Sequence, residues 1–222
     1  MFYSNRRDAG RRLAREESLR RLSGPETIAL GLTRGGVEVA AELAHQLGIA
    51  LDAIIVKKIG SPGNPEYAIG AIAESGEPVV NAGEVRAFGI EEADLAEVVA
   101  EKRRQIARQR NLYRGGRPLP ALGGRTVLLV DDGIATGLTM RAAVAAVRQA
   151  GARHVVVVVP VGPDSTLARF EREGVEVVCP ERPLDFWAVG TYYSDFSPVE
   201  DDDVVRLLRE AGVGGSGAAR AA

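Results

Sequence analysis

The stretch VLLVDDGIATGLTM, residues 127–140, joins an apolar run, two adjacent carboxylates and a turn rich in glycine and threonine. The apolar run suits a buried strand, and the glycines let the backbone bend into a following helix. Threonine hydroxyls and the free N–H groups of that helix N-terminus would hold a phosphate monoester. Asp131 and Asp132 would accept hydrogen bonds from hydroxyl groups, so a phosphorylated sugar would satisfy both halves of the stretch.

The same alternation of strand and helix patterns extends along the chain. Short runs rich in Val, Ile and Leu predict strands at 27–32, 53–58, 126–131, 154–160 and 176–179. Amphipathic stretches separate them, including one over 36–47. This alternation predicts an α/β fold with a mostly parallel, Rossmann-like sheet flanked by helices. Ligands bind beyond the carboxyl ends of such strands, which is where residues 131–139 fall.

Three regions depart from the simple alternation. Residues 4–22 predict a leading helix, and residues 60–81 form a loop punctuated by Gly and Pro, with a possible strand pair at 67–75 and 78–81. A long helix is predicted near 91–113; the insertion that contains it exceeds an ordinary connection and would serve as a lid or an oligomer contact.

The length and composition suit a single domain. The chain has 222 residues, of which 45% are hydrophobic. We expect one domain over 1–211, with its core at 25–83 and 124–180 and a helical insertion at 84–123. The tail, 212–222, is rich in Gly and Ala, and we expect it to be disordered.

Cysteine and histidine usage limits the possible chemistry. The single cysteine, Cys179, excludes an intrachain disulfide and a cysteine-based zinc cluster, and His45 and His154 lack metal-ligand spacing. The sequence has no long apolar run, and its first residues are too charged for a secretory signal. We therefore expect a cytoplasmic protein with no membrane partner.

Charged residues gather in three places although the net charge is only −2. Residues 1–23 are rich in arginine, residues 91–114 are acidic first and basic last, and residues 200–203 are acidic. The arginines alternate with acids and lack interleaved aromatic residues, which disfavours a nucleic-acid surface. We interpret these clusters as solvated helix faces.

The opening stretch has a structural alternative, a Rossmann-like turn whose aspartates only cap the chain. It contains neither GxxxxGK[ST] nor GxGxxG, so P-loop and dinucleotide sites are disfavoured.

The stretch resembles the motif with which type I phosphoribosyltransferases bind 5-phosphoribosyl 1-diphosphate (PRPP). This resemblance implies the fold of that family, with a small hood segment at 181–199. It also implies that Asp131 and Asp132 hold the ribose hydroxyls. The implied 5-phosphate site comprises Gly133, Ile134, Ala135, Thr136, Gly137, Leu138 and Thr139.

Two further segments resemble diphosphate-binding elements of the same family. The turn Thr33-Arg34-Gly35-Gly36 is similar to the family's pyrophosphate loop, and Lys57 and Lys58 are similar to a basic dipeptide that faces pyrophosphate. The resemblance makes Asp131, Asp132, Lys57 and Arg34 the candidate catalytic residues. Taken alone, the first segment is a common strand-to-helix turn, and the lysines suit a solvated strand end.

The loop and hood segments supply the remaining candidates. Glu66 and Tyr67 lie where the family has a flexible catalytic loop, although the prolines beside them also suit a rigid turn. Residues 184–196 resemble the base-binding segment of 6-oxopurine enzymes, with Trp187 stacking on the base, Val189 beside it and Asp195 reading its edge. Trp187 equally suits a core position.

The resemblance implies transfer of a phosphoribosyl group to a nitrogen nucleophile such as a purine or pyrimidine, with Mg²⁺ and within a homodimer. Asp131 and Asp132 would reach the metal indirectly, through ribose hydroxyls or water. Ala135 matches adenine enzymes, whereas the hood segment matches 6-oxopurine enzymes, so the base stays open. A PRPP-binding sensor without turnover is the alternative function, and a scaffold assembled through the helix at 91–113 is a third.

Overall fold

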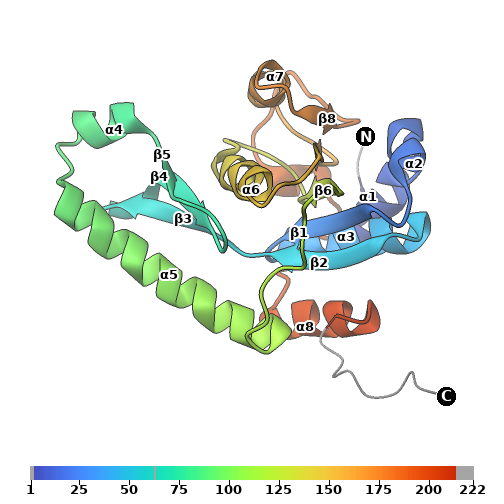
Figure 1. Cartoon of the computed structure of the whole chain (residues 1–222). Coiled ribbons are helices and arrows are strands. Elements are labelled where there is room, and N and C mark those ends of the chain that lie inside the picture. The colour runs from blue at the N-terminus through green and yellow to red at the C-terminus, as the bar shows by residue number, and fades with distance from the viewer. Residues whose placement is uncertain (1–2, 63, 214–222) are drawn as a thin grey trace.

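The core of the protein is a five-stranded parallel sheet, described by a computed structural model over residues 3–62 and 64–213 (Figure 1). The strand order is β2-β1-β6-β7-β8, and every neighbouring pair is parallel. These strands are β1 (Thr27–Leu32), β2 (Ala50–Ile54), β6 (Thr126–Val130), β7 (His154–Val158) and β8 (Glu176–Val178). The predicted α/β fold with a parallel sheet is confirmed.

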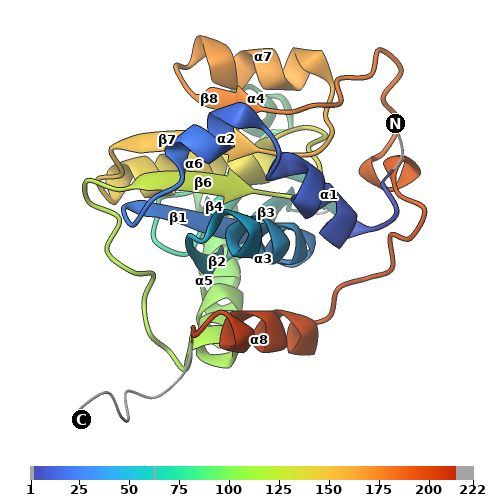
Figure 2. The same cartoon turned by 90° about the vertical axis from the view of Figure 1, so that its right-hand side faces the viewer.

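Helices cover both faces of this sheet, as Figures 1 and 2 show. Successive residues of a strand point to opposite faces, so Leu128 and Val130 pack in one core cluster while Val127 and Leu129 pack in the other. One face carries α1 (Arg6–Leu13), α2 (Glu17–Leu22), α3 (Gly35–Leu47) and α8 (Asp201–Glu210). The other carries α6 (Leu138–Gln149) and α7 (Asp164–Arg172). The hood contains a short 3₁₀ turn, η1 (Val189–Tyr192).

An arm, residues 56–114, projects from the side of the parallel sheet (Figure 1). It contains a three-stranded antiparallel sheet of β3 (Val56–Ser61), β4 (Asn64–Ala73) and β5 (Val79–Val80). Two helices complete the arm, α4 (Ala82–Ala87) and the long α5 (Glu92–Arg114). The predicted strand pair at 67–75 and 78–81 and the long helix near 91–113 are confirmed.

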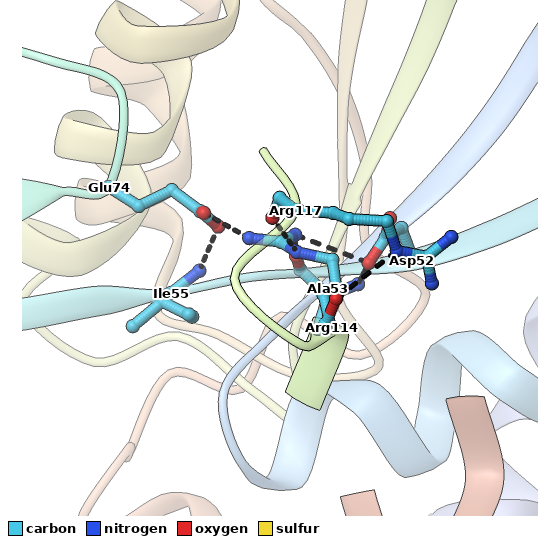
Figure 3. A network of polar contacts seen from close by, with 6 residues as sticks. All are labelled: Asp52, Ala53, Ile55, Glu74, Arg114 and Arg117. Carbon is cyan, nitrogen blue, oxygen red and sulfur yellow. Dashed lines mark hydrogen bonds and ion pairs between the residues drawn. The ribbon is translucent and has the colours of Figure 1, made fainter. Parts of the chain in front are cut away.

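A buried ionic network joins the arm to the core (Figure 3). The Arg114 guanidinium, at the end of α5, lies 3.3 Å from Asp52 and donates to the carbonyl oxygen of Ala53 at 2.9 Å. It also contacts the carboxylate of Glu74, which follows β4. Arg114 therefore links α5, β2 and the end of β4.

Two predictions about element boundaries are wrong. The run 53–58 is not one strand, because the chain leaves the parallel sheet at Ile55 and β3 pairs with β4 instead. The backbone N–H of Glu74 donates to the carbonyl oxygen of Ile55, and the Ile55 N–H donates to the Glu74 carboxylate at 3.1 Å, which marks this change of partner. The single helix predicted at 4–22 is two, and the break lets both Leu13 and Leu19 reach the same core.

The division of the chain into domain segments stays a prediction, and residues 214–222 of the expected tail lie outside the described part. Within that part, no helix is both long and apolar enough to span a bilayer.

Candidate active site

A groove of about 270 Å³ opens at the carboxyl ends of β1 and β6. Most of the predicted 5-phosphate turn lines it, together with one carboxylate, one lysine and one hood residue. These predicted residues are Thr33, Lys58, Asp131, Gly133, Ile134, Ala135, Thr136, Gly137, Thr139 and Val189. Segments that are far apart in the sequence therefore meet where a parallel sheet is expected to bind its ligand.

The turn at 133–139 presents an open helix N-terminus to the groove. Gly137 precedes α6 with φ of +76°, a conformation that glycine adopts without a Cβ penalty. Among the described residues, no side chain caps this helix, so its first N–H groups can meet an anion. Thr166 of α7 donates to the carbonyl oxygen of Ala135 at 2.7 Å and holds the turn from behind.

The acidic pair lies at the end of β6. Burial raises the pKa of Asp131 well above its usual range, and the neighbouring Asp132 raises it further. Burial also raises the pKa of Asp132, while a hydrogen bond from Arg6 lowers it. The Asp131 Oδ1 atom accepts from the backbone N–H of Asp132 at 2.9 Å. Two crowded carboxylates in this position suit hydroxyl donors.

The predicted diphosphate turn lies against the acidic pair. A Cβ added at Gly35 would lie 2.0 Å from Oδ2 of Asp132, and one added at Gly36 would lie 2.9 Å from Oδ1 of Asp131. Only glycine allows this approach. The Thr33–Arg34 peptide bond is cis. The Arg34 side chain, however, pairs with Glu200 at 2.7 Å, and it does not line the groove.

Lys57 and Lys58 do not act as one basic pair. They are neighbours on β3, so their side chains point to opposite faces. Lys58 lines the groove, close enough to lower the pKa of Asp131. Burial lowers the pKa of Lys57; Asp201 raises it, and the charges of Lys102 and Arg34 lower it. Lys57 therefore faces α5 and α8.

The expected catalytic loop is a β-hairpin formed by β3 and β4. Tyr67 donates to Glu84 at 3.3 Å, and its ring meets the Phe88 ring edge-on, so it contacts the α4 region of the arm. The Glu66 side chain lies outside the described part of the structure.

The hood candidates are separated from one another. Val189 lines the groove and contacts Gly133, where an added Cβ would lie 2.5 Å from Val189 Cγ1. The core interpretation of Trp187 is wrong, because this residue is 89% exposed. Asp195 lines a different cavity with Arg7 and Glu38, so the structure does not bring it into the groove.

Arg6 is the residue that the sequence interpretation missed. The arginines of 1–23 were expected to be solvated, yet Arg6 is only 6% exposed and its Nε donates to Asp132 at 2.7 Å. The signal was present, because Arg6 shares a helical stripe with Ala9, Gly10 and Leu13, all of which are buried.

Asp131 and Asp132 are the candidate metal donors at the groove. Among the side chains that the structure describes, no three of His, Cys, Asp or Glu gather as a metal site. Carboxylate oxygens suit Mg²⁺, but two of them do not make a cage, so an ion here would need further ligands from a bound molecule and water.

Comparison with known proteins gives a consistent family. The family model described as a phosphoribosyl transferase domain matches residues 3–196. Two Mycobacterium tuberculosis proteins, from strains CDC 1551 and H37Rv and provisionally named as phosphoribosyl transferases, are 44% identical over 210 residues. The match covers 95% of this chain but 47% of each relative, so the chain spans about half their length.

Two solved structures share the fold of this chain. The crystal structure of TT1426 from Thermus thermophilus is 43% identical, with a TM-score of 0.80 over 97% of this chain and 100% of that one. A Neisseria gonorrhoeae protein solved with bound ppGpp is 17% identical, with a TM-score of 0.50 over 96% of each chain, and shows only a shared fold. The chain therefore belongs to the phosphoribosyl transferase domain family.

Proposed function

We propose that this chain transfers the 5-phosphoribosyl group of PRPP to a nitrogen nucleophile and releases pyrophosphate. One observation carries the proposal. A single groove brings together an open helix N-terminus, the Asp131 carboxylate and the Lys58 ammonium group at the carboxyl ends of parallel strands. PRPP offers the matching groups, which are a phosphate, a vicinal diol and a diphosphate.

The parts of the groove would divide the recognition of PRPP between them. The turn at 133–139 would bind the 5-phosphate through backbone N–H groups and the hydroxyls of Thr136 and Thr139. Asp131 and Asp132 would accept hydrogen bonds from the ribose hydroxyls. The turn at 33–36 would place its backbone beside the diphosphate, and Lys58 would neutralise charge as pyrophosphate leaves. Lys57 faces away, so we assign it only a long-range contribution.

Magnesium fits this arrangement as an ion carried largely by the substrate. When bound, Mg²⁺ would neutralise diphosphate charge. Asp131 and Asp132 are the protein groups that would approach it, through ribose hydroxyls or water, since carboxylate oxygens are suitable ligands or acceptors for its hydration shell.

The acceptor is proposed to be a purine or pyrimidine base. Val189 would form one wall of its site, and the exposed Trp187 ring is available to stack on it. Asp195 is a weaker candidate, because its Oδ1 accepts from the backbone N–H and hydroxyl of Ser197 and it lines another cavity. A homodimer and a cytoplasmic location stay predictions from the sequence.

A PRPP sensor without turnover is the second candidate, and one observation favours it. Three of the four proposed catalytic residues, Asp132, Arg34 and Lys57, do not line the groove, and Arg34 pairs with Glu200. Such a protein would bind PRPP while providing little stabilisation for the leaving group.

Calorimetric titration with PRPP and Mg²⁺ tests the proposal, with pyrophosphate release measured against a panel of purines, pyrimidines and other nitrogen nucleophiles. Wild type should bind PRPP, and Asp131→Asn should weaken that binding by about 10-fold or more through loss of a charged acceptor. Release with one base supports the enzyme, and binding without release supports the sensor. If wild type gives no binding heat with PRPP, both the enzyme and the sensor proposals are wrong.

A further inference from the structure

The Arg6 side chain is enclosed by three segments of the chain. Its Nε donates to Oδ2 of Asp132 at 2.7 Å, and its Nη1 donates to the carbonyl oxygen of Ser197 at 2.8 Å. Its guanidinium carbon lies 3.9 Å from the centre of the Phe196 ring. One cation therefore ties together α1, the end of β6 and the hood.

Local packing explains how a charged residue reaches this position. Asn5 caps α1 by accepting from the backbone N–H of Asp8 at 2.9 Å, and Gly10 lets α1 approach α3 closely. A Cβ added at Gly10 would lie only 2.6 Å from the carbonyl oxygen of Val39. Burying an arginine is costly unless the charge is paired and hydrogen-bonded, and here Asp132 is its counterion.

The hood is bound to the same N-terminal segment by backbone contacts. Tyr3 donates its N–H to the carbonyl oxygen of Tyr192 at 2.8 Å, and Ser194 donates to Tyr3 at 2.8 Å. The Tyr193 hydroxyl donates to the backbone carbonyl oxygen of Asp132 at 2.5 Å. The backbone and the carboxylate of Asp132 are thus held separately, the first by the hood and the second by Arg6.

We propose that Arg6 is a positioning residue for ribose recognition, acting through Asp132. By occupying Oδ2, Arg6 fixes the carboxylate rotamer and leaves Oδ1 to accept from a ribose hydroxyl. Gly35 closes the other side of the pair, since an added Cβ there would lie 2.9 Å from Arg6 Nε as well as against Oδ2. This role rests on the proposed PRPP site, and it extends that site to the first helix of the structure.

The test compares PRPP, which contains the ribose diol, with inorganic pyrophosphate, which lacks it. PRPP and inorganic pyrophosphate would each be titrated with Mg²⁺ into wild type, Arg6→Lys and Arg6→Met. Arg6→Lys keeps the charge but loses the planar fork that serves Asp132 and Ser197 together. It should weaken PRPP binding by about 10-fold, and Arg6→Met by more. Pyrophosphate affinity should stay within about 2-fold in Arg6→Lys, because that ligand has no hydroxyl for Asp132.

The neighbouring residue supplies a matched control. Arg7 lies on the same helix, but its side chain is 49% exposed and its Nε lies 3.6 Å from Glu38. Arg7→Met should leave both affinities unchanged. Thermal midpoints recorded for every variant separate lost recognition from lost folding, and Arg6→Lys decides the question if Arg6→Met fails to fold.

A double-mutant cycle with Asp132→Asn tests whether Arg6 affects PRPP affinity through Asp132. If Arg6 acts through Asp132, Arg6→Met should cost PRPP affinity much less in the Asp132→Asn background than in wild type. Additive losses, equal losses for PRPP and pyrophosphate, or wild-type affinity in Arg6→Lys would each overturn the inference. Absence of PRPP binding in wild type would instead refute the proposed function.

Discussion

Two buried arginines, Arg114 and Arg6, pair with carboxylates at two different places in the fold. The Arg114 side chain is 2% exposed, and its partners Asp52 and Glu74 are 7% and 3% exposed. The Arg6 side chain is 7% exposed, but its partner Asp132 is 16% exposed and follows a residue that lines the groove. The contacts are chemically alike, while only one pair borders a site. Solvent access to the carboxylate, rather than the ion pair itself, distinguishes a structural network from a functional one.

The largest loss of stability is expected from breaking the fully buried Arg114 network. Arg114→Met would leave two buried carboxylates without their cation, which costs about 3–5 kcal/mol of unfolding free energy in comparable sites. Urea denaturation at neutral pH measures this loss. Arg172→Met is the control, because Arg172 is exposed and its Nε donates to a backbone carbonyl oxygen away from the network, that of Ala168, at 3.1 Å.

The pH dependence of Arg114→Met gives a second measurement. Burial raises the pKa values of Asp52 and Glu74 in the folded state, while Arg114 lowers them. Loss of Arg114 should therefore raise both pKa values further. A raised carboxyl pKa favours folding at low pH, and that contribution is lost as the pH rises through the folded-state value. The deficit of the variant should thus shrink as the pH falls toward the range of these carboxyls. A deficit independent of pH would show that packing, not charge, makes the network important.

A smaller loss of stability is expected from changing a glycine that lies against Asp131 and Asp132. A Cβ at Gly36 would lie 2.5 Å from the carbonyl oxygen of Val130 and 2.9 Å from the Cα of Asp131, so the backbone itself must move. Gly36→Ala should cost about 1–3 kcal/mol of stability and displace the turn at 33–36 from the acidic pair. PRPP titration should show a loss of about 10-fold or more. Gly24→Ala is the control, because in the described part of the chain no atom beyond its two sequence neighbours lies within 4 Å of its added Cβ. Unchanged affinity in Gly36→Ala would mean that the turn is not part of the site.

The sequence predicted the parts of the fold that depend on local pattern. The Val-rich runs and the helix after residue 137 follow from apolar spacing, the long helix near 91–113 agrees with its acidic start and basic end, and these elements are present. The turn at 133–139 was predicted from its glycines and threonines, which lie between a strand pattern and a helix pattern. The split of 53–58 was not predicted, because Ile54, Ile55 and Val56 are apolar enough for either sheet, and the choice depends on pairing with the distant β4.

The environments of charged side chains were the least predictable part of the site. Lys57 and Lys58 are adjacent in sequence, yet only the partner strand decides which of them faces the groove. Arg34 pairs with Glu200, which lies 166 positions away along the chain. Such long-range contacts leave no local pattern. The Arg6 stripe did, but arginine on an apolar face is uncommon enough that a solvated face was the better general expectation.

A substitution of Thr166 tests whether a hydrogen bond between uncharged groups also helps the turn at 133–139 to bind phosphate. Thr166→Val keeps the shape of the side chain but removes the donor to Ala135, at a cost of about 1 kcal/mol. Binding of PRPP or inorganic phosphate should weaken a few-fold in titration. Thr191→Val is matched to it, because its hydroxyl also donates to a backbone carbonyl, that of Ala188 at 2.7 Å, but in an exposed turn. Equal effects of the two variants on phosphate binding would exclude a specific role for Thr166.

Glu200→Gln should have the smallest effect, and in the opposite direction. The Arg34–Glu200 pair is 40% and 66% exposed, so solvent screens it and it contributes little stability. Glu200 also caps α8, and glutamine keeps an acceptor for that cap. Removing the charge should free Arg34 for the turn in which it lies, and pyrophosphate binding should tighten about 2- to 3-fold at low salt and less at about 1 M salt.

Glu77→Gln controls for a general change of net charge, since Glu77 pairs with Arg103 in a similarly exposed setting at 3.4 Å. Tighter pyrophosphate binding in Glu200→Gln alone would assign Arg34 to the diphosphate. Equal behaviour of the two variants would instead leave Arg34 as a surface partner of α8. The exposed pair would then resemble the Arg114 network in having a purely structural role, and Arg6 with Asp132 would be the only one of the three pairs that serves the groove.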